Sequence, residues 1–186
     1  MARAHFTLVV VATLDGYIAR APDHPPQTWA SAAEQAVFFA AVEQADWTVM
    51  GRHTHEAADK PNRRRIIFSS RAGRGDWRRP TQLWVDPRDV TARGLAALVE
   101  GVHPLHRGLI LGGTGVHHWF HAQGAIDEIS LTIEPLRFGS GLPMFRGFGG
   151  QDPLRVCRAL GYELEREERL NVEGTRLLTL RPTSRR

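Results

Sequence analysis

The sequence contains a single cysteine, Cys157, among its 186 residues, so no disulfide bond can form within the chain. It also lacks any run approaching eighteen apolar residues, which excludes an ordinary membrane-spanning helix. Residues 1–5 lead directly into a strand-like run, without the apolar segment and small-residue cleavage site of a secretion signal. These absences together predict a cytoplasmic protein.

Internal repeats, low-complexity blocks and linker-like stretches are absent as well. The composition, with 42% hydrophobic and 24% charged residues, is that of an ordinary globular protein. The length allows one domain with a substantial core. We therefore expect residues 1–186 to form a single domain.

Positive charge is concentrated in one part of the chain, the basic cluster between Lys60 and Arg79, in which Asp76 is the only acid. Its basic residues are Lys60, Arg63, Arg64, Arg65, Arg71, Arg74, Arg78 and Arg79. Such a cluster can bind nucleic acid or a phosphate-bearing small molecule, or it can be a solvated loop. Trp77 is its only aromatic residue, which makes nucleic acid the less favoured partner. A non-catalytic nucleotide- or nucleic-acid-binding module that uses residues 60–79 is kept as an alternative.

Strand and helix patterns alternate through most of the chain. Apolar runs bounded by turn residues predict buried strands at 6–12, 47–50, 65–68, 82–85 and 108–111. Further spacing and capping signals predict helices at about 31–45, 91–100 and 115–123, and a strand at 126–134. We expect two or three antiparallel strands over 154–181, with Cys157 on one of them and a hairpin turn at 172–175. The tail from Pro182 to Arg186 is expected to be disordered.

This order of elements predicts the fold class. Strands alternating with helices are typical of an α/β sheet, mostly parallel, with helices on both faces. The strands near the end of the chain predict an antiparallel C-terminal edge.

A glycine turn follows the predicted strand 108–111. The turn Gly112-Gly113-Thr114-Gly115 opens the helix that starts near Val116. Backbone N–H groups at such a helix start are unpaired and can hold an anion, although the same residues also form ordinary tight turns.

Two other predicted strands end in groups that suit phosphate. Gly51-Arg52-His53-Thr54 offers a cation, an imidazole and a hydroxyl, and Ser69-Ser70-Arg71 offers two hydroxyls and a guanidinium. Ligands of open α/β sheets bind beyond the carboxyl ends of the strands. Three such ends in one small sheet predict a dinucleotide site.

Several motifs occur in the order seen in dihydrofolate reductases: Thr13-Leu14-Asp15-Gly16-Tyr17-Ile18-Ala19, Val49-Met50-Gly51-Arg52-His53-Thr54, Ile66-Ile67-Phe68-Ser69-Ser70 and Leu109-Ile110-Leu111-Gly112-Gly113. Two later segments, at 126–131 and 134–145, more closely resemble the reductase domain of riboflavin biosynthesis. Both groups share one fold and belong to one superfamily. The resemblance covers about residues 5 to 180.

The resemblance implies a three-layer αβα dihydrofolate reductase-like fold and NADPH as hydride donor. It implies that Arg52, His53 and Thr54, next to Gly51, contact the cofactor phosphates. Ser69, Ser70 and Arg71 would surround the adenosine and its 2′-phosphate. The remaining cofactor residues would be Leu111, Gly112, Gly113, Thr114, Gly115 and Val116 beside the pyrophosphate and nicotinamide, and Val11 and Ile18 facing the nicotinamide.

The resemblance also indicates which residues face the substrate. Glu34, followed by Phe38 one helical turn later, matches the carboxylate that holds the pterin ring in dihydrofolate reductases. Ser31-x-x-Glu34 has the form of a capping box too, so capping and substrate binding both stay open. Asp15 is a catalytic candidate beside the nicotinamide, or it forms an Asx turn.

The substrate class implied is a heterocycle: a pyrimidine like 5-amino-6-(5-phosphoribosylamino)uracil, or a pterin such as dihydrofolate. The His-x-Glu and Pro-Cys-x-x-Cys signature of the zinc deaminase that often accompanies the riboflavin reductase is absent, which predicts a stand-alone reductase. His117, His118 and His121 have no matching carboxylate or cysteine motif, so no metal is expected. The resemblance further implies a homodimer that acts on a small molecule, with no membrane or nucleic-acid partner.

Overall fold

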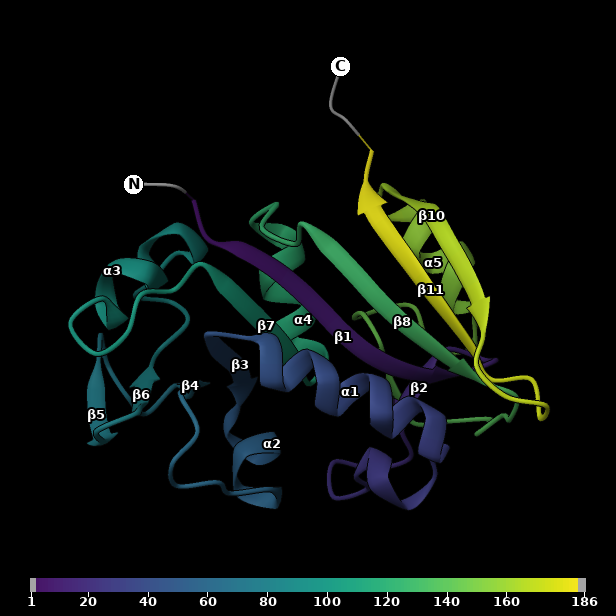
Figure 1. Ribbon diagram of the computed structural model, residues 1–186, viewed down its shortest axis with the longest axis horizontal. Helices are drawn as coiled ribbons and strands as arrows, with labels where there is room; N and C mark the ends of the chain where they lie inside the picture. Colours follow the sequence, from purple (N-terminus) through teal and green to yellow (C-terminus); the bar gives the residue numbers. More distant parts are fainter. Residues whose placement is uncertain (1–2, 184–186) are drawn as a thin grey trace.

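A computed structural model of the chain describes residues 3–183, in which one nine-stranded sheet has helices on both faces (Figure 1). The strand order is β10-β11-β8-β1-β7-β3-β4-β6-β5. Its strands are β1 (His5–Thr13), β3 (Trp47–Gly51), β4 (Arg65–Phe68), β5 (Asp76–Arg79), β6 (Gln82–Val85), β7 (Arg107–Gly112), β8 (Glu128–Glu134), β10 (Tyr162–Arg169) and β11 (Arg176–Pro182). β2 (Tyr17–Ala19) and β9 (Leu142–Pro143) pair in a small separate sheet.

The helices lie in two layers. They are α1 (Ala32–Gln44), α2 (Arg52–Ala57), α3 (Leu95–Val99), α4 (Thr114–Ala122) and α5 (Pro153–Ala159), with 3-10 turns η1 (Pro26–Thr28) and η2 (Ala92–Gly94). In Figure 1, α1 and α2 lie in front of the sheet, and α4 and α5 lie behind it. None of the helices within residues 3–183 is both long enough and apolar enough to cross a membrane.

The pairing confirms the predicted sheet. The strands β8, β1, β7, β3, β4 and β6 are parallel to one another, and β11 and β10 form the antiparallel C-terminal edge. The opposite edge, β5, is also antiparallel, which the sequence did not predict. β5 carries exposed charged residues in place of an apolar run, so only its backbone pairing with β6 makes it a strand.

The two faces of the sheet are packed differently. Side chains of β1 alternate between them: Phe6 contacts Phe120 of α4, with the ring centroids 4.9 Å apart, whereas Val9 and Val11 point to the α1 side. The larger apolar core joins the sheet to α4 and α5. On the other face, the buried residue of α1 is Glu34, so α1 stands off the sheet and leaves a cavity there.

One prediction for the C-terminal region is wrong. Residues 153–159 form helix α5, so Cys157 is buried in a helix and not in a strand. Asp152 caps this helix by accepting a hydrogen bond from the N–H of Arg155, and Pro153 occupies its first turn. This Asp-Pro start signal is visible in the sequence and outweighs the strand-like residues that follow.

The end of the chain otherwise matches the expected hairpin. β10 and β11 pair antiparallel, and the turn at 172–175 contains Gly174 at a φ of 100°, a conformation that favours glycine. Pro182, which was expected in a disordered tail, ends β11. The rest of that predicted tail, from residue 184, lies outside the described residues.

Candidate functional site

The carboxyl ends of three neighbouring parallel strands meet at one edge of the sheet. β3 lies between β7 and β4, and its register pairs Met50 with Gly112 and Gly51 with Phe68. The segments predicted to hold a dinucleotide, 51–54, 69–71 and 112–115, therefore come together. Only the parallel pairing produces this convergence, because antiparallel neighbours would place alternate ends on opposite edges.

The glycine turn after β7 is open to a ligand. A Cβ on Gly113 would meet nothing within 4 Å, and a Cβ on Gly112, at a φ of 116°, would lie 2.8 Å from Nε2 of His117. Within residues 3–183, no group accepts a hydrogen bond from the N–H of Thr114 or Gly115. The predicted free N–H groups at the start of α4 are thus present, and they suit an anion.

Thr114 and Val116 connect this turn to the rest of the fold. The Thr114 hydroxyl donates a hydrogen bond of 2.6 Å to the carbonyl of Pro143. The Val116 side chain is buried in the larger core, and its N–H is bonded to Gly113. Val116 therefore anchors the turn, in which Gly113 is half-buried and Gly115 is exposed.

The other two strand ends present charged and hydroxyl groups. Arg52 begins α2, donates to Glu56 over 3.1 and 3.2 Å, and lies 2.9 Å from the His53 ring. At the end of β4, the Ser69 hydroxyl accepts from the N–H of Arg71. Ser70 and Arg71 are exposed, and no acid among the described residues pairs with the Arg71 guanidinium.

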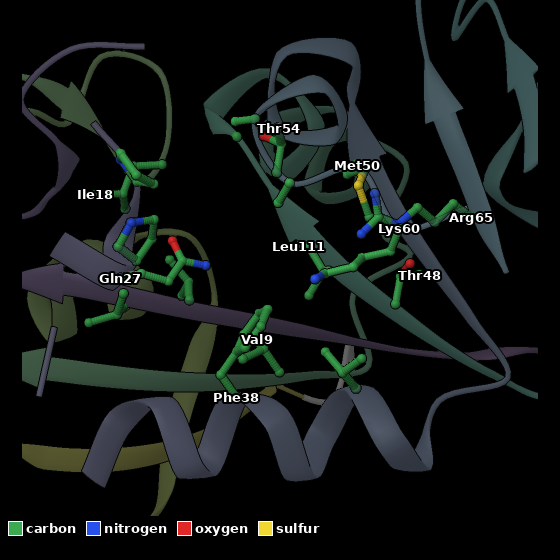
Figure 2. Close-up of a pocket in the computed structure, with 18 of the residues that line it drawn as sticks. Val9, Ile18, Gln27, Phe38, Thr48, Met50, Thr54, Lys60, Arg65 and Leu111 are labelled. Atoms are coloured by element: carbon green, nitrogen blue, oxygen red, sulfur yellow. The ribbon is translucent and has the colours of Figure 1, made fainter. Parts of the chain in front are cut away.

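A cavity of about 990 Å³ adjoins these strand ends, between α1 and the sheet (Figure 2). We call it the α1 cavity. Of the predicted site residues, the cavity is lined by Val11, Ile18, Glu34, Phe38, Thr54, Leu111 and Gly113. The remaining predicted residues lie at or near the adjoining strand ends and do not line it: Asp15, Gly51, Arg52, His53, Ser69, Ser70, Arg71, Gly112, Thr114, Gly115 and Val116.

The cavity wall also contains residues that were not predicted to belong to a site. The additional lining residues include Val9, Gln27, Thr48, Met50, Arg65 and Leu142. Gln27 lies in the 3-10 turn η1, where no motif signals a site. Leu142, in β9, belongs to the segment 134–145 that resembles the riboflavin reductases, but the resemblance gave it no role. Thr48 and Met50 sit in a buried strand, where the sequence pattern indicates packing only.

Asp15 has a structural role in the fold. Its carboxylate accepts hydrogen bonds from the Thr13 hydroxyl at 2.6 Å and from the N–H groups of Phe138 and Gly139 at 3.1 and 2.8 Å. Burial raises the pKa of Asp15, but these hydrogen bonds outweigh it and hold the pKa below its usual value. The ionised Asp15 thereby ties the turn after β1 to the segment that follows β8.

Glu34 occupies the first turn of α1 and is only 4% exposed. Its backbone N–H donates to the Ser31 hydroxyl, but its carboxyl does not return the bond. The N–H of Ser31 donates to Oε1 of Glu134 at 2.8 Å. Half of the predicted capping box is therefore formed, and the Glu34 carboxyl is left to line the cavity.

The pKa of the Glu34 carboxyl is raised well above its usual value. Burial raises its pKa from 4.5 to about 7, with repulsion from Glu134 as the second cause. A carboxyl group with this pKa exchanges its proton near neutral pH, as general acids and bases do.

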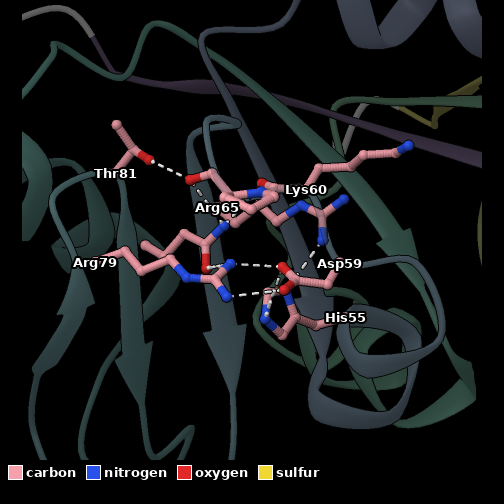
Figure 3. A network of polar contacts seen from close by, with 8 residues as sticks. His55, Asp59, Lys60, Arg65, Arg79 and Thr81 are labelled. Carbon is pink, nitrogen blue, oxygen red and sulfur yellow. Dashed lines mark hydrogen bonds and ion pairs between the residues drawn. The ribbon is translucent and has the colours of Figure 1, made fainter.

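The opposite end of the α1 cavity is cationic. Figure 3 shows the polar network behind it: Arg65 lies 3.0 Å from Nδ1 of His55, and Asp59 pairs with Arg79 at 2.6 and 2.8 Å. Gln82 donates to the carbonyl of Lys60 at 2.9 Å. The network holds residues 58–64 against β4 to β6, so that Lys60 borders the cavity.

Most arginines of the basic cluster are held by contacts within the fold. Arg63 pairs with Glu43, the Arg64 guanidinium donates to the carbonyl of Asp46, and Arg78 stacks on Trp84. Lys60 has no acidic partner among the described residues. The cluster therefore offers separate cations at the site and not one continuous free basic face.

His117 lines the cavity with a neutral ring. Its Nδ1 lies 2.9 Å from the carbonyl of Met144, and burial lowers its pKa to about 4. His121 instead contacts the Tyr162 hydroxyl at 3.0 Å. Within residues 3–183, no three or more His, Cys, Asp or Glu side chains are grouped so as to hold a metal ion.

Comparison with known proteins places the chain in a family. The family described as RibD C-terminal domain matches residues 4–166. No curated protein sequence matches the chain.

Solved structures share the fold. A riboflavin biosynthesis protein from Shewanella sp. PV-4 is 18% identical, with a TM-score of 0.66 over 96% of this chain and 99% of that one. Dihydrofolate reductase from Enterococcus faecalis, complexed with NADP(H), is 17% identical, with a TM-score of 0.63 over 96% of each chain. RibD from Acinetobacter baumannii is 18% identical, with a TM-score of 0.74 over 97% of this chain and 58% of that one. The predicted dihydrofolate reductase-like fold is confirmed.

The perturbed Glu34 carboxyl should make stability depend on pH. The group ionises near 4.5 in the unfolded chain and at about 7 in the folded protein, so across this window the folded state keeps a proton that the unfolded state has lost. The contribution of Glu34 to the free energy of unfolding therefore falls as pH rises from 4.5 through 7. Relative to wild type, Glu34→Gln should gain ~2–3 kcal/mol more at about pH 8 than at about pH 4.

Urea denaturation of both proteins at the two pH values measures this difference. An equal effect of the substitution at both pH values would show that Glu34 titrates normally.

Proposed function

The chain belongs to the RibD C-terminal domain family, and from this we propose that it is an NADPH-dependent reductase of a heterocyclic substrate. The family and its dihydrofolate reductase-like neighbours support an oxidoreductase. One observation carries the proposal: a cavity with a buried, proton-exchanging carboxyl adjoins strand ends that present anion-binding groups. Hydride transfer between two bound molecules needs this pairing of sites.

The residues present fit NADPH. The free N–H groups of Thr114 and Gly115 suit its pyrophosphate, and the open Gly113 allows close approach of the backbone. The exposed Arg71 guanidinium, beside two serine hydroxyls, suits a 2′-phosphate. Bound NADPH would supply the hydride, while the protein holds and orients both molecules.

The α1 cavity suits a heterocycle with an anionic substituent. Its volume of about 990 Å³ is ample for a pterin or a phosphoribosylamino-pyrimidine. Glu34 can hydrogen-bond a ring nitrogen at one end, and Phe38 offers an aromatic surface next to it. Lys60 can neutralise a phosphate or carboxylate on the same ligand. A substrate like 5-amino-6-(5-phosphoribosylamino)uracil or dihydrofolate has both features.

We also propose that the protein is a cytoplasmic homodimer. The resemblance to riboflavin reductases supports the dimer, and the sequence composition supports the location. Sedimentation equilibrium should give twice the monomer mass, and a monomer mass at micromolar concentration would contradict the dimer.

Cofactor choice can be tested on Arg71. Arg71→Gln should weaken NADPH binding about 10–100-fold and leave NADH binding nearly unchanged, because only NADPH has the 2′-phosphate. Fluorescence titration of both cofactors measures this. Arg155→Gln, an exposed arginine on α5, is the matched control and should change neither affinity. Equal losses for NADPH and NADH would remove Arg71 from the 2′-phosphate site.

The reductase activity itself is tested by NADPH oxidation with a panel of pyrimidines and pterins, dihydrofolate included. We expect turnover with one class, and Glu34→Gln should lower kcat by about 10²-fold or more while NADPH affinity is kept. Turnover that survives the substitution would exclude Glu34 from the reaction. Salt-sensitive RNA or DNA binding with no NADPH binding would instead support a non-catalytic role for residues 60–79.

A further inference from the structure

Two buried carboxyl groups lie at the N-terminal end of α1. Glu34 belongs to the first turn of this helix, and Glu134 is the last residue of β8. They are 4% and 3% exposed. Glu134 begins the segment 134–145 that resembles the riboflavin reductases, but the resemblance assigns it no role.

Glu134 takes the bond that Glu34 would make in a complete capping box. In that motif, the glutamate three residues after the cap accepts from the N–H of the capping residue. Here the N–H of Ser31 donates to Oε1 of Glu134 at 2.8 Å. Among the described residues, no donor is hydrogen-bonded to the Glu34 carboxyl, which faces the α1 cavity instead.

Both oxygens of the Glu134 carboxyl accept hydrogen bonds. Its Oε2 accepts from the Thr175 hydroxyl at 2.7 Å, and Asn171 donates to the same hydroxyl at 2.9 Å. The Thr175 hydroxyl donates to Glu134, because the carboxylate oxygen is much nearer than the Ser31 hydroxyl, which lies 3.5 Å away. The start of α1 adds the positive end of the helix dipole. Hydrogen bonds to a carboxylate stabilise its negative charge.

No cation offsets that charge at Glu34. Among the described residues, Glu134 is the charged group that acts on Glu34. The facing residues of β1, Val9 and Val11, are apolar, and Arg176 at the start of β11 is paired with Glu167. Glu34 therefore experiences burial and repulsion together, without compensation.

We propose that Glu134 is a positioning residue for the proposed active site: its carboxylate takes the Ser31 N–H, leaves the Glu34 carboxyl free to face the α1 cavity and, as a buried negative charge next to it, favours the protonated form of Glu34. This rests on the proposed function of the α1 cavity. A protonated carboxyl can donate a hydrogen bond to an acceptor atom of the substrate, which a carboxylate cannot do. Glu134 thereby selects for heterocycles that present an acceptor, such as an unprotonated ring nitrogen or a carbonyl oxygen, to Glu34.

The proposal is tested by measuring the pKa of Glu34 directly, in the free protein. Carboxyl ¹³C NMR titration of ¹³C-glutamate-labelled protein reports each glutamate, and Glu34→Gln assigns the resonance. Glu134→Gln keeps the side-chain shape and an acceptor for Ser31 but removes the charge. It should lower the pKa of Glu34 by about one unit or more, a tenfold change in its proton affinity.

Two controls separate charge from structure. Glu128→Gln removes the same charge at the other end of β8, where Glu128 pairs with Arg181, and should leave Glu34 unchanged. Glu134→Asp retains the charge and should keep the pKa of Glu34 raised even if the shorter side chain weakens the Ser31 bond. Its titration also keeps the test decisive should Glu134→Gln fold poorly.

An unchanged Glu34 titration in Glu134→Gln, or a fall of equal size in Glu134→Asp, would overturn the proposal. The measurement needs neither cofactor nor substrate. A clear shift in a protein that fails to bind NADPH would therefore support the role of Glu134 while contradicting the reductase function.

Discussion

The parallel pairing of β7, β3 and β4 is the constraint on which the site depends. Because the three strands run in the same direction, their carboxyl ends share one edge, and each strand ends in groups that suit phosphate. The hydrogen-bonded register holds Gly112 beside Met50 without help from a ligand. The glycine turn proposed to bind an anion is therefore built into the sheet and does not need a flexible loop to assemble it.

The α1 cavity follows from how unevenly the two faces of the sheet are packed. The face toward α4 and α5 carries the continuous apolar core, whereas α1 contributes Glu34 as its buried residue. Phe38 and Val42, spaced as a core-facing stripe would be, border the cavity instead. Apolar surface that a purely structural helix would bury against the sheet is left available to a flat ligand.

Which charged side chains remain free in this molecule depends on their pairing within the fold and cannot be read from the composition. The basic cluster contains enough arginine to suggest a nucleic-acid surface, but Arg63, Arg79 and Arg78 are each paired or stacked within the fold. What remains near the site is a few separate cations, among them Lys60 and Arg71. Separate cations at fixed positions suit the phosphates of a small molecule better than the continuous backbone of a nucleic acid. Pairing also decides which acid is free in the site. Glu134 is bonded to the Ser31 N–H, and the Glu34 carboxyl is left without that partner.

The sequence by itself determined the elements and the order of the site segments. Apolar runs, glycine turns and the Ser31 cap are local signals, and they placed every parallel strand, α1 and the turn before α4 correctly. The sequence-based prediction failed where local signals conflict or are missing. Asp152-Pro153 starts a helix in a region whose later residues are typical of strands, and β5 forms only because it pairs with β6. Tertiary structure alone decided the role of Glu34. A capping box is a local pattern, and the sequence cannot show whether its glutamate bonds to the helix cap or faces a cavity. In this fold the Ser31 N–H is bonded to Glu134, which lies 100 residues after Glu34 in the chain, so the Glu34 carboxyl faces the cavity.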